Sequence, residues 1–220
     1  MNQPASQIRS GAVPLDSIVR NSFILLSMVL AVAGVGAFIG LGSGLTWSIG
    51  MWVGLMVVFI GGPFLIRAVK GQAAIGITFV WAGLVGFLLS PMVSAYLSLP
   101  GGSAIVLNAL GTTAVLFSAL AGYAVVSRRN FSFLGGFLFA GLFVVLAAII
   151  ANIFLQIPAL SVTISAVAVL LMSALILYDV SRLIHNGAEN ALDVVVSLFA
   201  DIVVMFSHLL NLFAFLSGDD

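Results

Sequence analysis

Cysteine is absent from this chain of 220 residues, and charged side chains make up only 6% of it. The lack of cysteine excludes disulfide bonds, thiol chemistry and cysteine-ligated metals. The low share of charged residues argues against an ordinary soluble domain, which carries roughly 25% of them. Lysine and arginine together number 7, as do aspartate and glutamate, and no basic patch is present, which argues against nucleic-acid binding.

Apolar side chains fill the chain instead. Hydrophobic residues make up 62% of the sequence and occur in long unbroken runs rather than short alternating strands. A soluble fold of this size cannot hide that much apolar surface. The expected fold class is therefore an all-α integral membrane protein, and the missing alternation argues against a barrel.

Seven runs are long enough to cross a membrane as helices, and their predicted ranges are 22–41, 45–66, 73–97, 103–126, 131–155, 159–180 and 192–216. We expect a cytoplasmic N-terminal tail over 1–21, a single seven-helix transmembrane domain over 22–217 and an acidic tail over 218–220. The first run is too long for the apolar part of a signal peptide, so it is expected to remain uncleaved. Pro91 is predicted to kink the third helix.

All basic residues fall on one face of this topology. The seven are Arg9, Arg20, Arg67, Lys70, Arg128, Arg129 and Arg182. They precede the first run or follow the second, fourth and sixth, while the other three loops carry no charge. By the positive-inside rule this face is cytoplasmic, so the N-terminus is expected in the cytoplasm and the C-terminus outside.

Glycines four residues apart are typical of closely packed membrane helices. Two such pairs are Gly36–Gly40 and Gly50–Gly54. We favour packing within the molecule for both pairs over a dimer interface.

Two aspartates lie inside the last two apolar runs. Asp179 and Asp201 are each 11 residues from Asn190 in the loop between these runs. In an antiparallel hairpin this spacing brings them to about the same depth, where they can face each other. A carboxylate within a membrane span is costly unless it is paired, hydrated or protonated, so both are candidates for a functional site.

The seventh run also carries a polar stripe, whose members are Asp193, Ser197, Asp201, Val204, His208 and Asn211. These residues recur every three or four positions, which keeps them on one face of a helix. Five of the six are polar, so the face is expected to meet the bundle interior. The seventh helix is therefore predicted to be central, with the other six around it.

The two aspartates admit two interpretations. In the structural one, Asp179 forms a capping ion pair with Arg182, one turn later. This leaves Asp201 unexplained, because no lysine or arginine lies within two turns of it on its own helix. In the functional one, two carboxylates that cannot both ionise cheaply share a proton and respond to pH near neutrality. Their ionised form attracts a hard cation such as Ca²⁺, with water or carbonyl oxygens completing a weak, transient site.

Other polar residues are accessory candidates. His208 is either a second titrating group or a neutral histidine that is hydrogen-bonded within the bundle. Asp193, Arg182 and Arg67 are the remaining accessory candidates near the pair. Hydrogen bonds between helices are expected from Asn108, Thr112, Asn152 and Gln156.

At these residues the chain resembles the Bax inhibitor-1 (transmembrane BAX inhibitor motif) family, and most closely its bacterial YccA-like branch. The resemblance covers nearly the whole chain from Arg20. Its motifs are Phe131-Ser-Phe-Leu-Gly-Gly-Phe-Leu, Ala151-Asn-Ile-Phe-Leu-Gln-Ile-Pro-Ala-Leu, Leu177-Tyr-Asp179 and Ser197-Leu-Phe-Ala-Asp201-Ile. The last two match the paired aspartates of the family.

The resemblance implies a bacterial inner-membrane protein with six helices around a central seventh. It also implies a pH-sensitive calcium leak in which Asp179 and Asp201 act as sensor and gate. The bacterial branch is linked to regulation of FtsH, a membrane-anchored AAA protease, which makes a non-conducting regulator the alternative function. The eukaryotic branch is linked to suppression of cell death through organelle calcium.

The chain departs from the family at three points. Leu198-Phe199-Ala200-Asp201 stands where the family usually has Leu-Tyr-Leu-Asp, and His208 lies in a stretch that is usually apolar. Some members latch the aspartates with an arginine from the second helix. Arg67 is the nearest candidate but lies about one residue out of register, so we do not expect the latch in the same form.

An intramembrane aspartyl protease is a further interpretation. Tyr178-Asp179 resembles one half of such a site, in which two facing aspartates do the chemistry. The other half should read Gly-x-Gly-Asp, and here it reads Leu-Phe-Ala-Asp. We therefore expect no enzyme and no cofactor beyond calcium as a transported ion. The expected partners are the lipid bilayer, calcium or protons, and a membrane-anchored protease.

Overall fold

The computed structural model describes residues 15–46, 48–186 and 191–218. Seven α-helices in these ranges are long and apolar enough to cross a membrane, which confirms the predicted fold class. They are α1 (Leu15–Gly42), α2 (Ile49–Ala68), α3 (Gln72–Leu97), α4 (Gly102–Ser127), α5 (Gly135–Leu155), α6 (Pro158–Asn186) and α7 (Ala191–Ser217), with a short 3₁₀ turn η1 (Ser132–Leu134) before α5.

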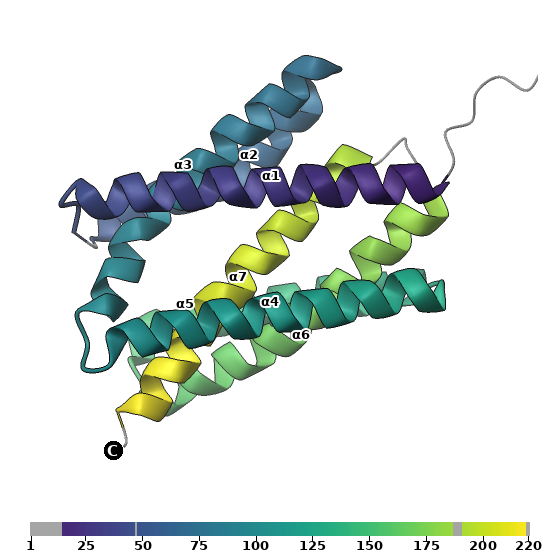
Figure 1. Ribbon diagram of the computed structural model, residues 1–220. Coiled ribbons are helices and arrows are strands. Elements are labelled where there is room, and N and C mark those ends of the chain that lie inside the picture. The colour runs from purple at the N-terminus through teal and green to yellow at the C-terminus, as the bar shows by residue number, and fades with distance from the viewer. Residues whose placement is uncertain (1–14, 47, 187–190, 219–220) are drawn as a thin grey trace, which may run out of the picture.

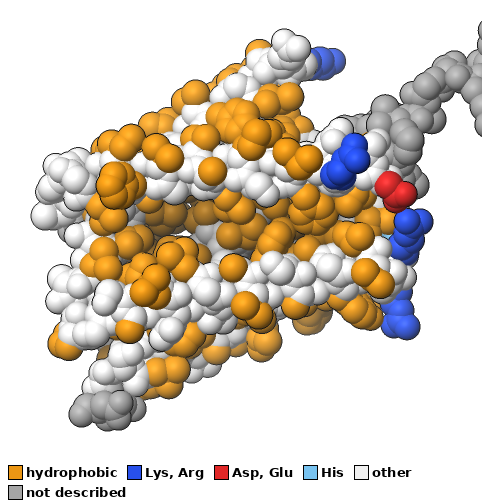
Figure 2. Space-filling model, in the orientation of Figure 1, with side chains coloured by type: hydrophobic (Ala, Val, Ile, Leu, Met, Phe, Trp, Pro, Cys, Tyr) orange, Lys and Arg blue, Asp and Glu red, His pale blue; other side chains and the backbone are white. Residues whose placement is uncertain are grey.

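Lysine and arginine side chains gather at one end of the bundle, here called the basic end (Figure 2). Two helices extend further towards this end than the sequence predicted. α1 begins at Leu15 instead of residue 22, and α6 ends at Asn186 instead of residue 180. Asp16 in the first turn of α1 and His185 in the last turn of α6 complement the helix dipoles there. Residues 1–14, with Arg9, and the acidic residues 219–220 lie outside the described ranges.

α7 packs against most of the other helices. It contacts α1, α2, α3, α4 and α6, and it crosses behind the gap between α1 and α4 (Figure 1). Among the described residues α5 contacts only α6 and η1, so the prediction that all six helices surround α7 is not confirmed. The run from Gly135 to Ala151 is apolar or glycine throughout, so nothing prevents α5 from facing lipid around most of its circumference.

Small residues bring α1 and α3 together. A Cβ added at Gly36 would overlap the carbonyl oxygen of Gly83, and one added at Gly86 would overlap the carbonyl oxygen of Ala33. The predicted internal packing of Gly36–Gly40 is confirmed. The same prediction is wrong for Gly50–Gly54, because a Cβ at Gly54 would have no atom within 4 Å.

Pro91 lies inside α3, which continues to Leu97. Proline lacks the N–H that would bond to the carbonyl four residues earlier, that of Phe87. The hydroxyl of Ser90 donates to this carbonyl oxygen at 2.7 Å. The acceptor that proline frees is thus satisfied within the same helix.

Candidate functional site

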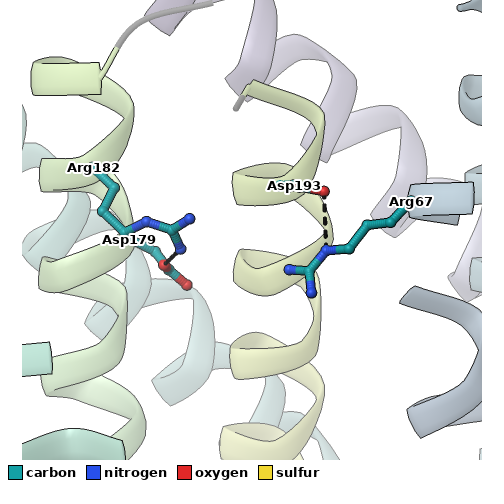
Figure 3. A network of polar contacts seen from close by, with 4 residues as sticks. All are labelled: Arg67, Asp179, Arg182 and Asp193. Atoms are coloured by element: carbon teal, nitrogen blue, oxygen red, sulfur yellow. Dashed lines mark hydrogen bonds and ion pairs between the residues drawn. The ribbon is translucent and has the colours of Figure 1, made fainter. Parts of the chain in front are cut away.

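Asp179 lies two turns before the end of α6 and is only 4% exposed. Its Oδ1 accepts a hydrogen bond from Nη1 of Arg182 at 3.0 Å. The guanidinium of Arg182 also lies over the Tyr178 ring, 5.6 Å from its centroid. The ion pair considered from the sequence is therefore present, and Figure 3 shows the Asp179 carboxylate projecting from α6 into the space beside α7.

Asp201 lies on α7 and is 7% exposed. Its Oδ2 is buried and has no hydrogen-bond partner in the part of the chain that the structure describes. The two carboxylates are close enough to interact electrostatically. Asp179 lies roughly 10 Å from the end of α6 and Asp201 roughly 15 Å from the start of α7, so both are well inside the bundle. Because a buried polar atom without a partner is rare and costly, this site would be stabilised by a proton, a cation or water.

Arg67 contacts a different acid. Its Nε donates to Oδ1 of Asp193 at 3.3 Å, which ties the end of α2 to the first turn of α7 (Figure 3). Asp193 is about 12 Å from Asp201 along the helix axis. The charge of Arg67 nevertheless acts on Asp179. The arginine of the second helix thus latches α2 to α7 through Asp193, in a form different from the one that the family resemblance suggests.

The half of the polar stripe that lies further from the basic end also contacts other helices. Nδ1 of His208 lies 3.1 Å from Oγ of Ser165 on α6, so this histidine is hydrogen-bonded within the bundle. Asn211 lies against the hydroxyl of Tyr96 on α3. His208 is about 10 Å beyond Asp201 along α7, and these contacts are separate from the aspartate pair.

Two other polar residues differ from expectation. Oδ1 of Asn152 accepts the N–H of Ile157 at 3.2 Å and so closes the turn between α5 and α6. Asn108 is exposed on α4. The hydrogen bonds between helices expected from these two residues are not formed in the described part of the chain, because Asn152 bonds within the turn and Asn108 is exposed.

Two residues that support the site were missed from the sequence. The indole N–H of Trp81 on α3 donates to the carbonyl oxygen of Val58 at 2.8 Å, and its ring meets Phe199 edge-on at 5.0 Å between centroids. Phe199 is two residues before Asp201. Ser181 on α6 accepts the N–H of Phe131 at 2.9 Å and so ties η1 to the end of α6. A tryptophan or serine in an apolar run carries no local signal for such roles, because its partners are distant in sequence.

Relatives match this chain along almost its entire length. A family model described as inhibitor of apoptosis-promoting Bax1 matches residues 15–218. The modulator of FtsH protease YccA of Escherichia coli K12 is 35% identical over 98% of this chain and 97% of its own length. The inner membrane protein YccA of Escherichia coli O6:H1 matches with the same identity over the same shares. An uncharacterised protein of Pseudomonas aeruginosa is 36% identical over 94% of this chain and 92% of its own length.

Proposed function

This multi-pass inner-membrane protein belongs to the Bax inhibitor family, inhibitor of apoptosis-promoting Bax1, and from that premise we propose that it is a pH-sensitive cation leak gated by Asp179 and Asp201. The observation that carries this proposal is the buried, unpartnered Oδ2 of Asp201 beside the buried carboxylate of Asp179. Both residues come from the two helices that form the C-terminal hairpin.

The charges around the pair do not balance. Arg182 neutralises Asp179, and Arg67 neutralises Asp193. Within the described ranges Asp201 is left without a cationic partner, and an ionised carboxylate buried in this way is costly. One proton restores neutrality and a cation offsets the same negative charge, so exchange between the two would couple cation passage to pH.

Calcium suits this site as a passing ion. Ca²⁺ takes about six to eight oxygen ligands. In the part of the chain that the structure describes, no three of His, Cys, Asp or Glu gather as they would around a bound metal ion. The two aspartates would supply part of the shell and carbonyl oxygens or water the rest. Weak coordination allows an ion to leave as well as enter, as conduction requires.

We assign the basic end to the cytoplasm. The basic residues in the first turns of α1, at or just after the ends of α2 and α4, and in the last two turns of α6 support this assignment through the positive-inside rule. The N-terminus is then cytoplasmic and the C-terminus outside. The cytoplasmic mouth of the leak would lie between α6 and α7, near Asp193.

A second candidate function is a non-conducting regulator of a membrane-anchored protease. It is favoured by the Escherichia coli relative named modulator of FtsH protease, which is 35% identical over 98% of this chain. In this function the polar stripe serves packing only, and lipid-facing or loop surfaces contact the protease. We expect no enzymatic activity in either case, because the segment before Asp201 lacks the glycines of an aspartyl protease site.

The leak is tested by Ca²⁺ uptake into liposomes that contain the purified protein, at about pH 6 and about pH 8, the range in which a shared proton is expected to exchange. We expect wild-type flux to differ between the two conditions and Asp201→Asn to remove the difference. Asp16→Asn is the matched control, because it removes an exposed acid at the start of α1 and should leave the difference intact. No flux above empty liposomes from folded protein would exclude the leak.

The regulator is tested in cells by the rate at which FtsH degrades a membrane substrate with and without this protein. If the protein regulates FtsH through its surface, the wild type, Asp179→Asn and Asp201→Asn should all change that rate to the same extent. Modulation that disappears in both folded variants would instead tie it to the aspartate pair.

A further inference from the structure

A crevice opens between α1 and α4 at the basic end. Among the described residues the two helices do not pack directly against each other, and α7 contacts both from behind. Side chains bridge them at two levels. Oδ1 of Asp16 accepts from Nη2 of Arg128 at 3.2 Å, and the rings of Phe23 and Phe117 meet at 6.2 Å deeper in the membrane.

The crevice has a volume of about 240 Å³ and combines a charged mouth with an apolar wall. The lining residues are Asp16, Val19, Arg20, Val125, Arg128 and Ile184. Arg20 and Arg128 are exposed and carry two positive charges against the single negative charge of Asp16. The mouth therefore keeps one excess positive charge directly above apolar side chains.

The ion pair at the mouth leaves Arg128 able to bind a further anionic group. The side chains of Arg128 and Asp16 are 68% and 87% exposed, so solvent screens their attraction. A guanidinium has five N–H donors in a fork that matches a phosphate, and Asp16 uses only part of it. Arg128 also ends α4 in the left-handed conformation, with φ 49°, where glycine is usual. A left-handed backbone is energetically costly for arginine, and ligand binding by the side chain would explain why arginine stands at this position.

We propose that this crevice binds the phosphate headgroup of an anionic phospholipid. Arg20 and Arg128 hold the phosphate, and an acyl chain follows the apolar surface between α1 and α4 down towards Phe23 and Phe117. Basic pockets between membrane helices at the cytoplasmic boundary suit such headgroups. A free phosphate would satisfy the arginines but would leave Val19, Val125 and Ile184 facing water, so the apolar wall favours a lipid.

The test is native mass spectrometry of the full chain in detergent, titrated with phosphatidylglycerol and, separately, with phosphatidylcholine. We expect preferential binding of phosphatidylglycerol, and an affinity reduced roughly tenfold in Arg20→Gln/Arg128→Gln. Lys70→Gln is the matched control, because it removes a positive charge from the same end of the bundle outside the crevice. An equal loss in the control would show attraction by general charge only and would overturn the site.

A second variant tests the crevice without changing its charge. Val125→Trp fills the apolar wall and should also weaken phosphatidylglycerol binding, which keeps the test decisive if the double arginine variant fails to fold. Excess inorganic phosphate should not displace the lipid. Displacement by phosphate, or unchanged lipid binding in Val125→Trp, would overturn the assignment to a lipid.

Discussion

Arg67 of α2 and Asp193 of α7 form an ion pair across 126 residues of sequence, with 3.3 Å between Nε and Oδ1. The pair joins two helices at the basic end, two turns from the buried aspartates. The two side chains are 52% and 34% exposed, so solvent screens the attraction between them. We infer that this contact orients α2 against α7 more than it stabilises the fold.

A double-mutant cycle with Arg67→Gln and Asp193→Asn should therefore give a small coupling energy. We expect less than about 1 kcal/mol, the range of partly exposed ion pairs. The measurement is unfolding of the purified protein by sodium dodecyl sulfate in mixed micelles. A coupling above about 2 kcal/mol would mean that the pair behaves as a buried one.

The two buried aspartates should differ in their effect on stability. Asp179→Asn leaves Arg182 without its counter-charge, whereas Asp201→Asn removes an acid that has no cationic partner among the described residues. We expect Asp179→Asn to cost about 1–2 kcal/mol more, a modest value because the Arg182 side chain is 25% exposed. Thermal unfolding in detergent measures which of the two variants is less stable. Adding Arg182→Gln to Asp179→Asn should recover part of the loss, and the reverse order would contradict the assignment of partners.

Gly36 and Gly34 are two residues apart on α1 and should respond oppositely to alanine. Gly36→Ala places a methyl group into the backbone of α3 at Gly83 and should destabilise the protein by about 1–3 kcal/mol. Gly34→Ala meets no atom within 4 Å and should be neutral or slightly stabilising, since alanine favours the helix. Equal effects in the same unfolding assay would show that α1 and α3 are further apart than described.

Trp81 is expected to be the most sensitive aromatic residue near the site. Trp81→Phe keeps a ring against Phe199 but leaves the carbonyl oxygen of Val58 without the indole N–H. We expect a loss of about 1–3 kcal/mol, the cost of one lost hydrogen bond to a half-buried acceptor and of poorer packing around the smaller ring. Trp52→Phe on α2, which is only half-buried, is the control and should cost less. If both variants lose the same stability, the Val58 contact contributes nothing specific.

Local periodicity made much of this fold predictable. The stripe from Asp193 to Asn211 is a property of one helix, so it is visible in the sequence, and all of its polar residues are at least partly buried. The alternation of basic and uncharged loops likewise indicated seven spans. The pairing of Asp179 with Arg182 was accessible for the same reason, because both lie on one turn of α6.

Contacts between helices were less predictable, because they depend on how the helices rotate against one another. Gly36–Gly40 and Gly50–Gly54 have the same spacing, yet only the first packs against a neighbour. The spacing indicates that another helix can pack closely, but it does not indicate which helix. The same rotations decide which acid pairs with Arg67 and which carbonyl accepts from Trp81. Neither partner could be predicted from spacing alone.

Asp179 and Arg182 lie one turn apart on the same helix, so their pairing requires no other part of the protein. During biosynthesis α6 can therefore enter the membrane with its acid already neutralised by its own arginine. Among the described residues α7 has no such counter-charge near Asp201, and α7 is synthesised after α6. Its insertion should therefore depend on docking against the helices that are made before it.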